Sequence, residues 1–156
     1  MSLTVVQAFR FCHKCNTLFY EGRHEPAGTP KGLCPAGGSH EPMGFQFEIP
    51  ARATPSSTAQ DRWRFCGTCW AMYFDGFPQK GVCPGSGRGH TRETRFRHNF
   101  ALPHDVPETP TAQRQWRFCS KCNVMFYDGF EGKGRCTAGN GHVAQGHDFV
   151  LPHLRP

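Results

Sequence analysis

Aliphatic side chains are scarce in this sequence. Leu, Ile and Val together supply only 14 of its 156 residues, and no apolar run approaches the roughly 20 residues of a membrane-spanning helix. Glycine and proline are abundant, at 18 and 13 residues, which favours turns over helices. These features argue against a helical bundle, against a parallel-sheet enzyme and against insertion into a membrane.

Aromatic residues and cysteines replace the missing aliphatics. The chain has 14 Phe, 3 Trp, 3 Tyr and 9 Cys, with a net charge of only +6. A disordered chain has few aromatics and a high net charge, so this composition predicts a folded protein. Because so few aliphatics can form only a weak core, we expect the cysteines to supply additional cross-links.

One sequence unit occurs three times. Each copy contains an aromatic-Arg-Phe-Cys-x-x-Cys motif, an apolar-aromatic run, an acidic-Gly pair, a Lys-Gly dipeptide, a third Cys and a final segment that ends in Pro. The first cysteines of successive copies, Cys12, Cys66 and Cys119, lie 54 and 53 residues apart. We predict repeats over residues 1–50, 61–103 and 114–152, with connectors rich in Pro, Ser, Thr and Ala at residues 51–60 and 104–113.

Local patterns place the repeats in the all-β class. Aromatics alternate with polar residues between Gly and Pro, which predicts about four short strands per copy, including one around the third Cys. A unit of about 45 residues is too small to cover its own aromatics. We therefore expect the three zinc-stapled repeats to pack together with pseudo-threefold symmetry, in the manner of a trefoil or prism. The alternative is three independent zinc ribbons on flexible connectors.

The cysteines predict metal sites. Each copy has three Cys and the chain has nine, so disulfides would leave unpaired thiols, and a redox Cys-x-x-Cys would need a βαβ context that is missing. A His follows the third Cys after five, six and five residues, and no other His matches in all three copies. Three thiolates and one imidazole form a closed structural zinc site. The predicted ligands of three Zn²⁺ ions are Cys12, Cys15, Cys34 and His40; Cys66, Cys69, Cys83 and His90; and Cys119, Cys122, Cys136 and His142.

The pattern Trp-Arg-Phe-Cys-x-x-Cys, Phe-Tyr-x-Gly and Cys-Pro-x-Gly-x-x-His resembles tandem Cys₃His zinc-binding, zinc-ribbon-like repeats of largely uncharacterised bacterial proteins. The resemblance covers all three copies, although Thr137 replaces the Pro in the third and one extra residue precedes His90. Such repeats are similar to modules appended to secreted hydrolases, which implies a binding role without naming a ligand.

Catalysis has little support in the sequence. The recurring acids Glu21, Asp75 and Asp128 each lie in a turn that explains them, and no nucleophile motif is present. His98 and His147 match each other in two copies only, as do His104 and His153. A zinc ion with four protein ligands has no position for water. We expect a protein that is not an enzyme.

Surface features suggest a binding module. Three thiolates on each zinc lower the formal charge from +6 to about +3, which weakens a nucleic-acid interpretation. Trp70 replaces the Asn of the other copies, and an Arg cluster lies nearby in sequence. We expect recognition of a protein or glycan partner through repeat loops, with nucleic acid as the alternative. The candidate contact residues are Trp70, Arg88, Arg92 and Arg95.

The N-terminus lacks the charged and apolar regions of a signal peptide. Reduced thiols also suit the cytoplasm. We therefore expect a cytoplasmic location, with export by a signal-independent route as the alternative.

Overall fold

The structure is a computed structural model that describes residues 4–21, 34–51, 55–85, 87–92 and 99–154. Every regular element in these ranges is a β-strand, so the all-β prediction is confirmed. No helix in the described part is long and apolar enough to cross a membrane.

Within the described residues there are nine strands, three from each repeat. The strands are β1 (Thr4–Cys12), β2 (Leu18–Tyr20), β3 (Pro42–Ala51), β4 (Ala59–Phe65), β5 (Met72–Phe74), β6 (Phe100–Pro103), β7 (Ala112–Cys119), β8 (Met125–Tyr127) and β9 (Ala144–Pro152). In every repeat the first strand pairs antiparallel with both others, so that β1, β4 and β7 each lie between two partners. The pairing of Ala51 with Phe100 joins repeats 1 and 2 into one six-stranded sheet.

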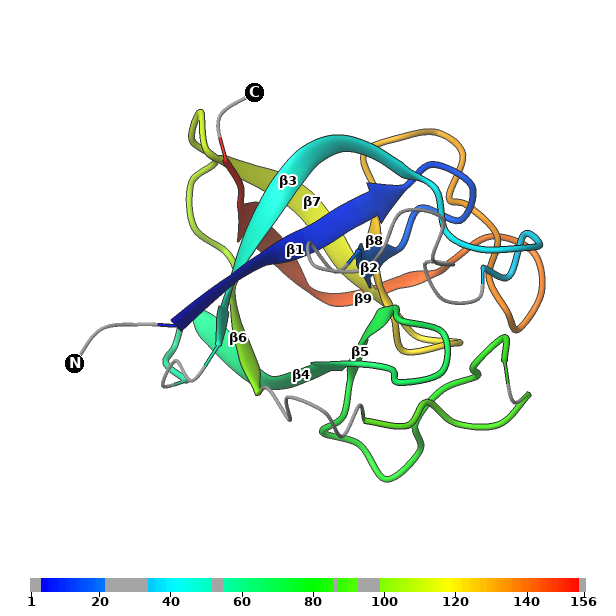
Figure 1. Ribbon diagram of the computed structural model, residues 1–156. Helices are drawn as coiled ribbons and strands as arrows, with labels where there is room; N and C mark the ends of the chain where they lie inside the picture. Colours follow the sequence, from blue (N-terminus) through cyan, green and yellow to red (C-terminus); the bar gives the residue numbers. More distant parts are fainter. Residues whose placement is uncertain (1–3, 22–33, 52–54, 86, 93–98, 155–156) are drawn as a thin grey trace.

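The three repeats close into a ring. Strands β3, β6 and β9 contact one another, and so do the short strands β2, β5 and β8, which lie toward the middle of the molecule in Figure 1. Single β-bridges link each short strand to the next repeat, at Phe19 with Ala71, Tyr73 with Val124, and Phe126 with Thr17. The repeats are therefore packed with pseudo-threefold symmetry, and the alternative of independent zinc ribbons is wrong.

Aromatic rings build the core across the repeat boundaries. One buried ring of each repeat meets a buried ring of the next edge-on, with centroids 5.2 to 5.3 Å apart, in the pairs Phe9–Phe100, Trp63–Phe149 and Trp116–Phe47. Edge-to-face pairs are favourable because the positive ring edge meets the negative ring face. These large rings supply the buried apolar surface that the scarce aliphatics cannot.

The strand expected around the third Cys is not present in repeats 2 and 3, where Cys83 and Cys136 follow irregular backbone. Gly81 and Gly134 explain the difference. Both have a positive φ, and a Cβ on either would collide with a backbone carbonyl of the next repeat. The segment therefore packs against its neighbour as a tight loop and does not pair in a sheet, which accounts for the Lys-Gly dipeptide.

Candidate metal centres and the pockets between repeats

The structure brings the twelve predicted ligands together as three groups. All twelve side chains are buried, and within each group the ligand atoms lie within 4.8 Å of one another. The first and third Cys sulfurs are 3.8 to 4.0 Å apart, and the second sulfur lies 3.4 to 3.5 Å from the His Nδ1. Tetrahedral zinc needs about 3.8 Å between sulfurs and about 3.5 Å between sulfur and nitrogen. The donor set and its spacing fit zinc.

A tight turn after the first long strand presents the two cysteines of each Cys-x-x-Cys pair. In repeat 1, the backbone N–H of Asn16 donates to the backbone carbonyl of Cys12 at 2.7 Å, and Asn16 has a φ of 64°. Lys14 donates to the carbonyls of Gly37 and Ser39 at 2.6 and 2.9 Å, which ties the His-bearing loop to the Cys turn. Asparagine tolerates the left-handed conformation better than most residues. The turn and loop thus hold the cage from both sides.

Crowding of the donors changes their proton affinities. Hydrogen bonds from Cys122 and Cys136 lower the pKa of the Cys119 thiol far below its ordinary value. Hydrogen bonds with Cys119 and Cys136, together with burial, raise the pKa of the Cys122 thiol. Burial lowers the pKa of His142, but hydrogen bonds to Cys119 and Cys136 outweigh it and raise the pKa to about 9. Three thiolates this close would repel one another, so full deprotonation of the group requires cationic charge nearby. A bound Zn²⁺ would supply it.

Each metal-site histidine also contacts the next repeat. Its Nε2 lies 2.9 Å from a backbone carbonyl, in the pairs His40–Cys69, His90–Cys122 and His142–Cys15. A carbonyl only accepts hydrogen bonds, so Nε2 carries the proton and Nδ1 offers its lone pair to the metal. The carbonyl belongs to a metal-binding Cys of the neighbouring repeat. The three centres are therefore linked head to tail around the ring, a contact that sequence analysis missed.

An aromatic ring stacks on the imidazole face of each of these histidines. The rings stack at centroid distances of 4.8 to 5.0 Å, in the pairs Phe19–His40, Tyr73–His90 and Phe126–His142. These aromatics are the residues that bridge to the next repeat. The repeat-to-repeat contact and the metal cage thus share side chains.

The recurring charged residues have structural partners. Arg10 donates to the carbonyls of Phe45 and Gly44, both at 3.1 Å, and Arg117 donates to that of Gly146 at 3.0 Å. Asp75 pairs with Lys80 at 2.9 Å, and the equivalent Asp128 pairs with Lys133 at the same distance. These arginines hold the third strand of a repeat, and these carboxylates hold a turn.

The candidate contact residues differ in solvent exposure. Trp70 is half-buried, with its ring edge-on to Tyr20 at 6.0 Å and a φ of 66°. Arg88 is exposed, whereas Arg92 is half-buried and forms a β-bridge with Cys66. Arg95 lies outside the described residues. Among these four, Arg88 is the one that the structure places in solvent.

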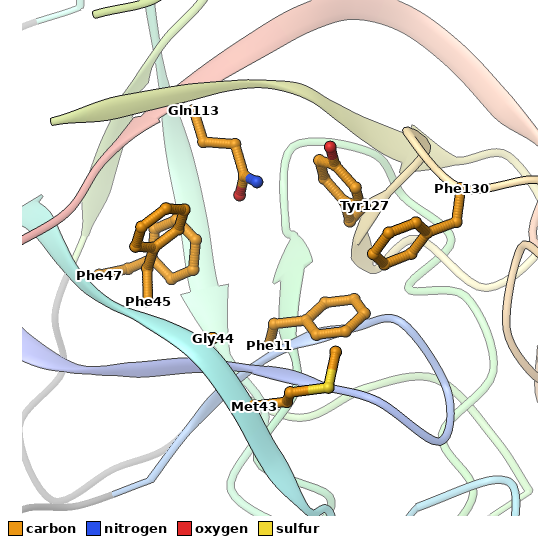
Figure 2. Close-up of a pocket in the computed structure, with 8 residues that line it drawn as sticks. All are labelled: Phe11, Met43, Gly44, Phe45, Phe47, Gln113, Tyr127 and Phe130. Carbon is orange, nitrogen blue, oxygen red and sulfur yellow. The ribbon is translucent and has the colours of Figure 1, made fainter. Parts of the chain in front are cut away.

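In the part of the chain that the structure describes, two pockets lie at corresponding places between repeats, and they differ in size. The Phe130 pocket has a volume of about 100 Å³ and is lined by Phe11, Met43 and Phe45 of repeat 1, by Tyr127 and Phe130 of repeat 3, and by Gln113 at the end of the connector. In Figure 2, Phe45 lies on one side, Tyr127 and Phe130 on the other, and the Gln113 amide closes one end. The Phe77 pocket has a volume of about 310 Å³ and is lined by Phe118, Gln145 and His147 of repeat 3, by Phe74 and Phe77 of repeat 2, and by Gln60 at the end of the connector.

The phenyl rings that name the pockets are half-exposed, Phe77 at 43% and Phe130 at 49%. Sequence analysis did not single them out. The available signal was a Phe directly after the Asp-Gly pair in repeats 2 and 3, where repeat 1 has Arg23. The pocket residues come from separate repeats, so only the packed ring brings them together.

Comparisons with protein-family models, with curated proteins and with solved structures gave no match to this chain. The three buried Cys₃His groups support the zinc-binding part of the resemblance to tandem Cys₃His repeats. Membership of that group of proteins stays a prediction.

Proposed function

We propose that the protein is a non-catalytic, zinc-stabilised binding module that recognises a protein or glycan partner through the pockets between its repeats. The observation that carries the proposal is the pair of half-exposed rings, Phe77 and Phe130, at equivalent pockets. Each ring packs edge-on against two others, at centroid distances of 5.1 to 5.9 Å. A large exposed aromatic that is rigidly held is typical of a binding surface.

A lysine clamp holds the turn that carries each ring. Lys80 Nζ donates to the carbonyls of Asp75 and Phe77 at 2.8 and 2.6 Å, and it also pairs with the Asp75 carboxylate. Lys133 makes the same three contacts in repeat 3. A ring that is already ordered loses little conformational entropy when a partner binds. The clamp therefore supports recognition by preformed surfaces.

The metal centres support a structural role for zinc. Each group offers four protein ligands, all buried, so a bound ion would have no position for water or substrate. The carboxylates that recur in repeats 2 and 3 are engaged in lysine clamps. Zinc would thus stabilise the ring of repeats, and the pockets would carry the function.

Binding of the zinc-loaded chain to immobilised glycans, peptides, DNA and RNA tests the proposal. We expect a glycan or peptide to bind with an affinity that changes little between about 50 and 200 mM salt, because the pockets are aromatic and neutral. The double variant Phe77→Ala/Phe130→Ala should lose this binding and keep three zinc ions. Binding to nucleic acid alone, with steep salt dependence, would contradict the proposal. So would full binding by the double variant.

A further inference from the structure

The Phe77 pocket combines apolar walls with neutral polar groups. Its walls include the rings of Phe74, Phe77 and Phe118, and its polar lining consists of Gln60, Gln145 and His147. No Lys, Arg, Asp or Glu belongs to the lining that the described residues form. A charged ligand would lose hydration here without gaining a counter-charge. A neutral ligand fits this lining better.

Gln60 supplies a hydrogen-bond donor. Its Oε1 lies 3.0 Å from the indole Nε1 of Trp63. An indole N–H only donates, so the oxygen of the Gln60 amide must face it. The amide nitrogen has no hydrogen-bond partner within the described residues, so Gln60 can donate to a ligand in the pocket that it lines. The orientation of Gln60 is thus set by a buried neighbour.

His147 supplies an acceptor. Its Nδ1 lies 3.2 Å from the carboxylate of Asp105, and its ring stacks on His104 at 3.7 Å. His104 donates to the same carboxylate oxygen at 2.8 Å. The nearby carboxylate favours a proton on Nδ1, which leaves Nε2 as the acceptor when the ring is uncharged. Asp105 and His104 therefore position His147.

We infer that the Phe77 pocket, as a ligand site of the binding module proposed above, binds a neutral saccharide residue. A saccharide hydroxyl both donates and accepts, which matches the Gln60 amide and the His147 Nε2. The C–H face of the sugar ring would pack on the phenyl ring of Phe77. A purely apolar ligand would leave Gln60 and His147 without water or a partner, which costs free energy. The volume of about 310 Å³ accommodates such a ligand.

The Phe130 pocket provides a control within the same molecule. Phe45 occupies the position of His147 there, and Met43 occupies that of Gln145. Phe45 stacks on His153 at 3.7 Å, as His147 stacks on His104, so the backbone arrangement is the same. The aromatic walls correspond, but the Phe130 pocket has about 100 Å³ against about 310 Å³ and lacks both the His147 acceptor and the Gln145 amide. The saccharide is therefore expected to select the Phe77 pocket.

Isothermal titration of the full zinc-loaded chain tests the assignment. The probes are glucose, galactose, mannose, N-acetylglucosamine and their β-linked disaccharides. We expect at least one to bind, and Phe77→Ala and His147→Phe each to weaken it by tenfold or more. Ser120→Ala, at an exposed position outside both pockets, should leave the affinity unchanged, and Phe130→Ala should weaken it far less than Phe77→Ala. His147→Phe introduces the residue that repeat 1 already has, and three zinc ions per chain verify that each variant folds.

Two results would overturn the inference: none of these saccharides binds, or Phe130→Ala weakens binding as strongly as Phe77→Ala. Peptide binding identifies which proposal has failed. If the chain binds a peptide through both pockets but no saccharide, the binding module stands and the saccharide assignment is wrong. If a saccharide binds equally well to the Phe77→Ala/Phe130→Ala variant, both proposals are wrong.

Discussion

The metal centres and the pockets lie in the same ring of repeats, yet they have diverged to different extents. The first-to-third sulfur distance varies only from 3.8 to 4.0 Å among the three centres. The two pockets differ in chemistry, because Met43 and Phe45 in one correspond to Gln145 and His147 in the other. A metal cage accepts few ligand types and one geometry. The fold requires only that the side chains of a pocket wall fill space. These side chains can therefore change without loss of the fold.

The cages are also the junctions between repeats, whereas the pockets are open at the surface. Each cage His donates to a carbonyl of the next repeat. Damage to one centre should therefore reach all three repeats, while damage to a pocket should stay local. The following predictions test this contrast, beginning with the largest effect.

Loss of one zinc ligand should unfold the whole chain. Structural zinc contributes on the order of 10 kcal/mol in small domains, comparable to the total stability of a domain. In Cys119→Ser we expect loss of β circular dichroism, tryptophan emission shifted to the red and fewer than three zinc ions. Chelation of the wild type should do the same. Ser120→Ala, at the exposed neighbouring position, is the control. Retention of two zinc ions in a folded Cys119→Ser chain would show independent centres.

A methyl group at the repeat 3–repeat 1 junction should be the next most damaging change. Gly134 has a φ of +76°, and its Cβ would collide with the Cys15 carbonyl. We expect Gly134→Ala to lower the free energy of unfolding by about 3 kcal/mol through strain and displacement. Gly132→Ala adds the same methyl where no atom lies within 4 Å, and it should change little. Urea denaturation of both variants measures the difference. Equal stabilities would mean that the junction is loosely packed.

Asn123 tests the polar part of a junction. It is fully buried, has a φ of 67° and exchanges hydrogen bonds of 3.1 Å with Gln79 of repeat 2. We expect Asn123→Ala to cost about 2 kcal/mol, measured by urea denaturation. Asn140 has a similar φ of 56° but is exposed, so Asn140→Ala isolates the backbone contribution. If both variants lose the same stability, the hydrogen bonds to Gln79 contribute nothing.

Trp70 should give the smallest effect. Its side chain is half-buried, and its backbone carbonyl, which accepts from the Tyr20 amide at 2.8 Å, is retained in any variant. We expect Trp70→Ala to cost about 1 kcal/mol, against more than about 3 kcal/mol for Trp63→Ala in the core. Thermal denaturation monitored by circular dichroism compares the two. A loss at Trp70 as large as that at Trp63 would place Trp70 in the core and remove it as a partner contact.

The amino-acid sequence alone determined the repeats, the all-β class and the composition of each metal group. These features depend on short spacings, such as Cys-x-x-Cys and the five or six residues between the third Cys and the His. Packing was also predictable in outline, because units of about 45 residues cannot bury their own rings. The strand expected around the third Cys was wrong in repeats 2 and 3, since the glycine before it packs against the next repeat.

The tertiary structure alone decided how the centres are linked and where the pockets lie. The bond from His142 to the Cys15 carbonyl joins residues 127 positions apart, and nothing in the local pattern around either residue predicts it. The Phe77 pocket likewise needs side chains from repeats 2 and 3 on one surface. Ligand type and spacing are local properties of the chain, and they can be read from it. Contacts between repeats depend on how three similar units close into a ring, which the order of residues within one unit does not specify.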